Sequence, residues 1–146
     1  MEGLQNEPDA FGSTFEKEST EPLEVWVDRL TRNAIFGGFF GDRLVGVAGF
    51  YVLAATKLSH KGVLWGMYVT PEARGSGLAA ALVDTLLEHA RKEVEQVQLT
   101  VAVTNPRARR FYQRMGFVEY GLEERALKYK GAYHDEVLMV KKFYHF

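Results

Sequence analysis

The sequence predicts an α/β protein with one central, twisted mixed β-sheet and helices on both faces. Short apolar runs rich in β-branched and aromatic residues alternate with two helical patterns along the chain. A glycine-rich turn joins a buried strand pattern at residues 63–69 to the longer helix. The composition, 47% hydrophobic and 25% charged over 146 residues, is ordinary for a globular protein. We therefore expect a single domain over residues 1–146, with the element order ββ–β–α–β–α–ββ.

The N-terminal segment predicts helix and loop. Residues 1–20 are polar apart from Phe11 and Phe15, which favours a short helix followed by a loop. Residues 22–32 predict an amphipathic helix that starts near Pro22, because proline suits the first helical position. The apolar side chains assigned to its buried face are Leu23, Val25, Trp26 and Leu30.

The middle of the chain predicts a β-hairpin and then a strand–loop–helix unit. Residues 33–40 and 43–52 flank a glycine–aspartate turn, and this arrangement is typical of a hairpin. Residues 54–61 predict a loop, and residues 63–69 predict a buried strand. After the glycine-rich turn, apolar residues recur at helical spacing over residues 78–92.

The C-terminal part predicts a strand, a short helix and a second hairpin. Residues 97–103 are β-rich, and residues 105–115 form the second helical pattern. Residues 117–127 and 133–140 predict the last two strands, joined by a turn at Tyr129-Lys130-Gly131.

The turn Arg74-Gly75-Ser76-Gly77-Leu78-Ala79 predicts an anion-binding site. Backbone N–H groups and a helix N-terminus converge after such a turn, and the helix dipole adds about half a positive charge. Gly75 and Gly77 allow a phosphate to approach the backbone, where side chains would block it. A Walker loop is excluded because no Gly-Lys-Ser/Thr ending exists, and a mid-chain strand after a hairpin fits a Rossmann site poorly. The alternative is that the glycines only let the helix pack close to the strand.

The second motif is the short helix that begins at Asn105 and ends before Gly116. Asn105 predicts the N-cap, Pro106 the first helical residue and Gly116 the helix stop. The residues predicted to form its packed face are Ala108, Phe111, Tyr112 and Met115. Four arginines on this helix, Arg107, Arg109, Arg110 and Arg114, give it a strong positive charge.

Together, in this order and about thirty residues apart, the two motifs resemble those of the GNAT superfamily of acyl-CoA-dependent N-acetyltransferases. The family's loop pattern Gln/Arg-x-x-Gly-x-Gly/Ala is matched by Arg74, Gly77 and Ala79. Its following pattern, Asn-x-x-Ala-x-x-Phe/Leu-Tyr-x-x-x-Gly-Phe, is matched by Asn105, Ala108, Phe111, Tyr112, Gly116 and Phe117. With weaker signals, the similarity extends over nearly the whole chain.

The resemblance implies acetyl-CoA as co-substrate. It implies that the backbone of the loop binds the CoA pyrophosphate, through Arg74, Gly75, Ser76, Gly77, Leu78 and Ala79. It further implies that Met67 and Val69 offer backbone groups to the pantetheine arm and the acetyl carbonyl. Asn105, Arg109 and Tyr112 complete the predicted cofactor-binding set, although capping its own helix accounts for Asn105 equally well.

Acetyl transfer to an amine needs attack on the thioester, stabilisation of the oxyanion and protonation of the departing thiolate. Tyr112 occupies the family's position for the proton donor, and the alternative is a packed aromatic side chain. The family's glutamate before the loop has no acidic counterpart here. His60, at the entrance of the strand before the loop, is the predicted base because an imidazole of pKa near 6.5 can deprotonate an ammonium. Asp135 and Glu136 are the alternatives.

The acceptor is predicted to be a primary amine of a small molecule or a peptide. Acidic and aromatic residues of the C-terminal hairpin would favour a cationic amine, or else form surface ion pairs. A net charge of −1 argues against bulk nucleic-acid binding. The chain has no cysteine, and its four histidines lack ligand spacing, so we expect no metal. Without a membrane-spanning apolar run or a signal peptide, we expect a cytoplasmic protein.

The N-terminus departs from the family, whose members begin with an extra strand before the segment that starts at Glu7. A sheet without this first strand would have an unpaired edge. Either the chain is a shortened version or a partner covers the edge, and a homodimer would do so. These departures leave open two alternatives to an enzyme: a non-catalytic acyl-CoA-binding or sensing domain, and an oligomeric scaffold.

Overall fold

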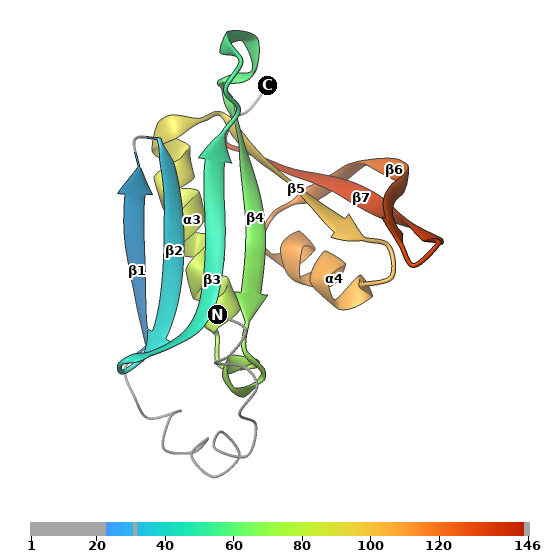
Figure 1. The fold of residues 1–146 in the computed structure, drawn as a ribbon. Helices are drawn as coiled ribbons and strands as arrows, with labels where there is room; N and C mark the ends of the chain where they lie inside the picture. The colour runs from blue at the N-terminus through green and yellow to red at the C-terminus, as the bar shows by residue number, and fades with distance from the viewer. Residues whose placement is uncertain (1–22, 31, 145–146) are drawn as a thin grey trace. The chain divides into compact units, whose positions relative to one another are not determined.

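The computed structural model describes residues 23–30 and 32–144. Within these residues, seven strands form one mixed sheet in the order β1-β2-β3-β4-β5-β7-β6, and two α-helices accompany it (Figure 1). The predicted class, a mixed sheet with helices, is confirmed. The chain divides into two compact units, which are described separately. Unit 1 comprises Met1–Tyr51 and Leu64–His89, and unit 2 comprises Val52–Val63 and Ala90–Phe146. A single domain over residues 1–146 stays a prediction.

Unit 1 places a meander of strands against the longer helix (Figure 1). Its elements are β1 (Leu23–Leu30), β2 (Asn33–Phe40), β3 (Arg43–Val52), most of β4 (Lys61–Val69), a 3-10 turn at Pro71–Ala73 and most of α3 (Leu78–Glu93). β1 pairs with β2, and β2 with β3, in antiparallel register. Phe36, Phe50, Leu82 and Leu86 are fully buried in its core. Burial of such side chains is the main stabilising contribution to this unit.

The helix predicted at residues 22–32 is wrong, because the structure has β1 there. Val25 and Val27 are half-buried, whereas the residues that follow each of them, Trp26 and Asp28, are exposed, so burial follows the two-residue period of a strand. The β-branched side chains of Val25 and Val27 also favour a strand over a helix. The prediction for residues 1–20 lies outside the described residues.

β1 lies along the outer edge of β2, and the absence of the family's first strand stays a prediction. β1 pairs with β2 along eight residue pairs, from Leu23↔Phe40 to Leu30↔Asn33. β1 is therefore the terminal strand on this side of the described sheet. The indole of Trp26, on β1, is 64% exposed.

A buried histidine ties α3 to the β1–β2 turn within unit 1. His89 is 6% exposed and lies edge-on to the rings of Phe36 and Phe50. Its Nδ1 accepts a hydrogen bond from Arg29 Nε at 3.4 Å. Its Nε2 lies 3.2 Å from the carbonyl oxygen of Arg32, so in this tautomer Nε2 carries the ring proton and donates it to that oxygen. These contacts give His89 a structural role, linking α3 to β1 and to the turn that follows it.

Unit 2 contains a second strand set with the shorter helix beside it (Figure 1). It includes a 3-10 turn at Thr56–Leu58, the start of β4, β5 (Gln96–Ala102), α4 (Pro106–Arg114), β6 (Val118–Tyr129) and β7 (Ala132–Lys142). β4 and β5 pair in parallel from Lys61↔Gln96 to Val63↔Gln98, and β7 pairs antiparallel with both β5 and β6. The predicted strands, helix and turn of this part of the chain are confirmed, with ends shifted by one or two residues.

None of the helices in the part of the chain that the structure describes is long and apolar enough to cross a membrane.

Candidate functional site

In unit 1, the glycine-rich turn adopts a conformation that needs glycine at two positions. The backbone of Gly75 has φ +80° and that of Gly77 has φ +90°. A Cβ atom added at either glycine would meet no atom within 4 Å. Space is therefore open above both residues, and strain at positive φ is the reason that other residues would be unfavourable.

The turn and the first turn of α3 present backbone donors without protein acceptors. Ser76 Oγ accepts a hydrogen bond from the N–H of Leu78 at 3.3 Å, and Ala81 donates to Gly77 O at 3.0 Å. Within the described ranges, nothing accepts the N–H groups of Gly75, Gly77, Ala79 and Ala80. The first turn of α3 also carries no acidic residue. Four free donors at a helix N-terminus fit a bound phosphate or diphosphate.

Leu78 anchors this donor set to the sheet. Its side chain is fully buried, and its methyl groups fill the space that a Cβ would need at Gly38 and Gly46. The first residue of α3 is thereby held against β2 and β3, whose glycines allow the close approach. Ser76 Oγ also donates a hydrogen bond to Ala73 O, which ties the turn to the preceding 3-10 turn. Leu78 thus contributes its backbone to the predicted cofactor site and its side chain to the core.

Arg74 and the end of β4 lie next to this turn. The exposed guanidinium of Arg74 donates from Nε to Val69 O at 3.3 Å. The carbonyl of Val69 therefore already accepts one hydrogen bond. Met67, two residues earlier on the same strand, is half-buried.

Gly66 has φ +62° inside β4, which sequence reasoning missed. A positive φ within a strand redirects the peptide groups beside it, as bulges next to active sites do. The signal available in the sequence was an isolated glycine within a strand pattern.

A partly buried ion pair precedes the turn in unit 1. Glu72, in the 3-10 turn, has a side chain that is only 3% exposed. Its Oε2 accepts a hydrogen bond from Arg43 NH2 at 2.9 Å. Arg43 is the first residue of β3. Sequence reasoning singled out neither residue, because their 29-residue separation gives no local pattern.

In unit 2, α4 has the caps that the sequence predicts. Asn105 Oδ1 accepts the N–H of Ala108 at 3.1 Å, and Pro106 follows as the first helical residue. Gly116 ends the helix with φ +97°. The side-chain oxygen of Asn105 is therefore used by the helix. Its backbone N–H donates to Ala102 O at 2.9 Å and its carbonyl oxygen accepts the N–H of Arg109 at 3.3 Å, so its side-chain NH2 is the group that remains to donate to a ligand.

Tyr112 lies on the buried side of α4. Its residue exposure is 8%, and its ring makes edge contacts with Phe111 and Phe117. Burial of the phenol raises the pKa of Tyr112 to about 12. At neutral pH the hydroxyl is therefore protonated and can serve as a proton donor, but not as a base.

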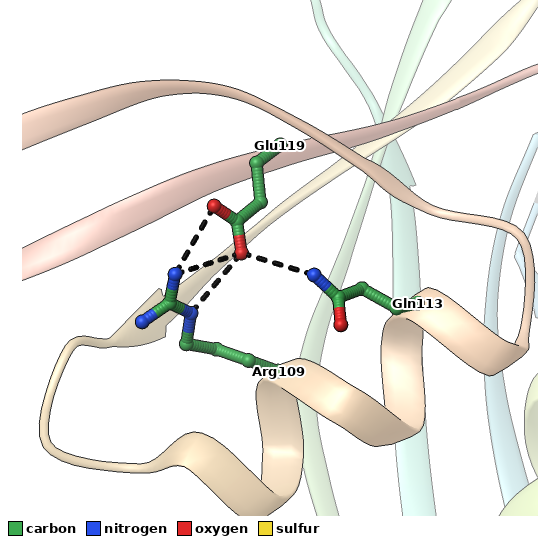
Figure 2. Close-up of polar contacts among 3 residues, drawn as sticks. All are labelled: Arg109, Gln113 and Glu119. Carbon is green, nitrogen blue, oxygen red and sulfur yellow. Dashed lines mark hydrogen bonds and ion pairs between the residues drawn. The ribbon is translucent and has the colours of Figure 1, made fainter.

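Arg109 is engaged within unit 2 by Glu119, at the start of β6 (Figure 2). Its Nε and NH2 atoms donate to the carboxylate oxygens at distances between 2.9 and 3.1 Å. Gln113 Nε2 donates to the same carboxylate at 3.3 Å. This bidentate ion pair links α4 to β6. Glu119 therefore competes with CoA for the guanidinium of Arg109, which the sequence assigns to CoA binding.

The three residues considered for the base, His60, Asp135 and Glu136, all belong to unit 2. His60 precedes β4, and its carbonyl oxygen accepts the N–H of Glu95 at 2.8 Å. The predicted pyrophosphate turn follows β4, so the nine residues of this strand lie between His60 and the turn in the sequence. Asp135 Oδ1 accepts the N–H of Arg125, and Glu136 pairs in register with Glu123.

Among the residues described, no group of three or more His, Cys, Asp or Glu side chains could hold a metal ion.

The chain is similar to known acetyltransferases in both sequence and fold. Residues 3–117 match the Acetyltransferase (GNAT) family. The spermidine N(1)-acetyltransferase of Vibrio cholerae serotype O1 is 27% identical over 149 aligned residues, which cover 99% of this chain and 84% of that protein. The structure of an acetyltransferase of the GNAT family from Streptococcus pneumoniae is similar with a TM-score of 0.72 at 25% identity, over 77% of this chain and 68% of that one. The structure of yncA from Salmonella typhimurium with its cofactor acetyl-CoA has a TM-score of 0.71 at 17% identity, over 78% of this chain and 66% of that one. At this identity, the last comparison shows likeness of fold alone.

Proposed function

Because this chain belongs to the GNAT family of acetyltransferases, we propose that it transfers an acetyl group from acetyl-CoA to a primary amine by direct attack in a ternary complex. The observation that carries the proposal is the set of four N–H donors at Gly75, Gly77, Ala79 and Ala80. They fit the diphosphate of CoA in number and chemistry. Acetyl-CoA in the Salmonella neighbour supports this choice of ligand.

In the proposed site, the turn holds the diphosphate and strand β4 supplies backbone groups. The N–H groups of the turn bind phosphate oxygens, with Arg74 adding a positive charge at the turn. Backbone groups of Met67 and Val69 contact the pantetheine arm and the acetyl carbonyl, where an N–H donor stabilises negative charge on oxygen. For Val69 the proposed group is the N–H, because the acetyl carbonyl oxygen needs a donor, whereas the Val69 carbonyl is an acceptor and receives the hydrogen bond from Arg74 Nε.

Tyr112 is the proposed acid. The amine nitrogen attacks the acetyl carbon and loses its proton to a base, the C–S bond breaks, and the sulfur takes the phenolic proton. Water then restores the proton to Tyr112. A phenol of pKa about 12 is a weaker acid than a thiol of pKa about 8.5, by about three and a half pKa units. We therefore place the proton transfer late, when the C–S bond is nearly broken and the charge on sulfur is greatest.

The proposed reaction also needs a base and an acceptor amine. His60 is retained as the base, directly or through water, with Asp135 and Glu136 as alternatives. For the acceptor, the Vibrio relative is named for spermidine, which supports an amine of a small cationic molecule, and a peptide amine is the other candidate. A cytoplasmic location, a homodimer and independence from metal stay predictions of the sequence.

Calorimetric titration with acetyl-CoA tests the cofactor site. We expect micromolar binding that Gly77→Glu abolishes, because a carboxylate would enter the space open for phosphate. Adenosine, which lacks the diphosphate, serves as the control for binding through the adenine nucleoside alone. Absence of acetyl-CoA binding to the wild-type chain would overturn the proposal.

A screen of amines with Tyr112→Phe tests the chemistry. We expect turnover of at least one amine, and a loss of about 10²–10³-fold in kcat in the variant, which keeps the ring but lacks the donor. The dissociation constant of acetyl-CoA should change less than about threefold. Tight acetyl-CoA binding without transfer to any amine would favour the alternative function, a non-catalytic acyl-CoA-binding domain.

A further inference from the structure

The ion pair between Arg43 and Glu72 lies immediately before the anion-binding turn in unit 1. The carboxylate side chain of Glu72 is 3% exposed, whereas the side chain of Arg43 is 36% exposed. A buried carboxylate is strongly unfavourable unless a positive charge and hydrogen bonds compensate it. The 2.9 Å contact from Arg43 NH2 to Glu72 Oε2 provides such compensation.

The 3-10 turn that carries Glu72 also holds the anion-binding turn in place. Arg74 donates its N–H to Pro71 O at 3.3 Å, and Ser76 donates its N–H to Ala73 O at 3.2 Å. Ser76 Oγ donates to the same Ala73 carbonyl. A shift of Glu72 is therefore transmitted to the backbone that presents the N–H donors.

The charge of Glu72 also matters for an anion at this site. Gly75 follows Glu72 by three residues, so their Cα atoms lie within about 11 Å of each other. This is close to the Debye length of about 10 Å at 0.1 M ionic strength, and buried charges are screened less than exposed ones. An uncompensated carboxylate here would repel a diphosphate bound at the turn.

We propose that Arg43 is a positioning residue for the anion-binding turn, acting through Glu72. Its guanidinium neutralises the buried carboxylate and fixes the 3-10 turn, so that the N–H groups of Gly75 and Gly77 keep their affinity for an anionic ligand. The inference rests on the proposed function in one respect, namely that the ligand is the diphosphate of CoA.

The test measures the dissociation constant of CoA by calorimetry for a set of matched variants. Arg43→Gln keeps a hydrogen-bond donor beside Glu72 but removes the charge, and Arg43→Lys keeps the charge. We expect Arg43→Gln to weaken CoA binding at least tenfold and Arg43→Lys to weaken it less than threefold. The double variant Arg43→Gln/Glu72→Gln should bind within threefold of the wild type, because neither charge remains.

Each outcome separates this inference from the proposed function. If the wild-type chain does not bind CoA, the proposed function falls. If the wild type binds and Arg43→Gln binds equally well, the positioning role is overturned. It is also overturned if the double variant binds as weakly as Arg43→Gln, because the pair would then be merely structural. If Arg43→Gln does not fold, the double variant decides: binding within threefold of the wild type supports the inference, and a tenfold loss overturns it.

Discussion

Among single residues, Tyr112 couples stability to pH. Its pKa in the folded chain, about 12, lies above the ordinary value of 10. The stability that comes from keeping the phenol neutral is therefore complete below pH 10 and is lost as the pH rises towards 12. At pH 11, the free energy of unfolding of the wild type should have fallen by about 1.4 kcal/mol more than that of Tyr112→Phe, relative to pH 9. Urea unfolding at the two pH values measures this difference, and parallel losses in both proteins would contradict it.

Thr70 supplies a second prediction about a single residue. It is 1% exposed, and its hydroxyl has no hydrogen-bond partner among the described residues. A buried hydroxyl without a partner is unfavourable, and a methyl group of the same shape is not. Thr70→Val should raise the free energy of unfolding by about 1 kcal/mol in urea titrations. Thr70→Ser, which keeps the hydroxyl and removes a methyl group, should lower it.

The elements show which local patterns in the sequence decide structure. Asn105, Pro106 and Gly116 predicted both ends of α4, because caps and stops act through the backbone of neighbouring residues. The glycine turn was predictable for the same reason. The segment at residues 22–32 was not, because its apolar residues fit a helical period while Val25 and Val27 fit a strand period. Pairing with β2 decides between the two, and no local pattern reports this pairing.

Contacts between elements were the part of the candidate site that the sequence could not predict. Arg109 was assigned to CoA, but the register of β6 brings Glu119 to its guanidinium. Glu72 and Arg43 likewise meet only after β3 and β4 are in place. Side-chain partners depend on the packing of whole elements, so they follow from the fold and not from spacing along the chain.

The turn before α3 allows a matched test at the level of the element. Gly77 and Gly131 both have positive φ, +90° and +79°, and an added Cβ would meet nothing within 4 Å at either site. Gly77→Ala and Gly131→Ala should each lower the free energy of unfolding by about 1–3 kcal/mol, through backbone strain alone. Only Gly77→Ala should also weaken acetyl-CoA binding, by about tenfold or more, because it narrows the approach to the N–H groups. Equal affinities of the two variants in calorimetry would remove the turn from the cofactor site.

For the whole molecule, binding of acetyl-CoA should appear as thermal stabilisation. A ligand that binds only the folded chain, at one hundred times its dissociation constant, adds about 2.7 kcal/mol. For a chain of this length, this corresponds to a rise in Tm of about 5–11 °C. Differential scanning fluorimetry with acetyl-CoA measures the shift, with Gly77→Glu as the control. A wild-type Tm that does not respond to acetyl-CoA would contradict the proposed cofactor.

Both tryptophans of the chain, Trp26 on β1 and Trp65 on β4, belong to unit 1. Excitation near 295 nm therefore produces emission from unit 1 alone, while the far-ultraviolet circular dichroism signal comes from the strands and helices of both units. The chain thus carries an intrinsic probe of one unit that needs no label. Comparing the two signals during a single denaturation experiment distinguishes cooperative melting from stepwise melting.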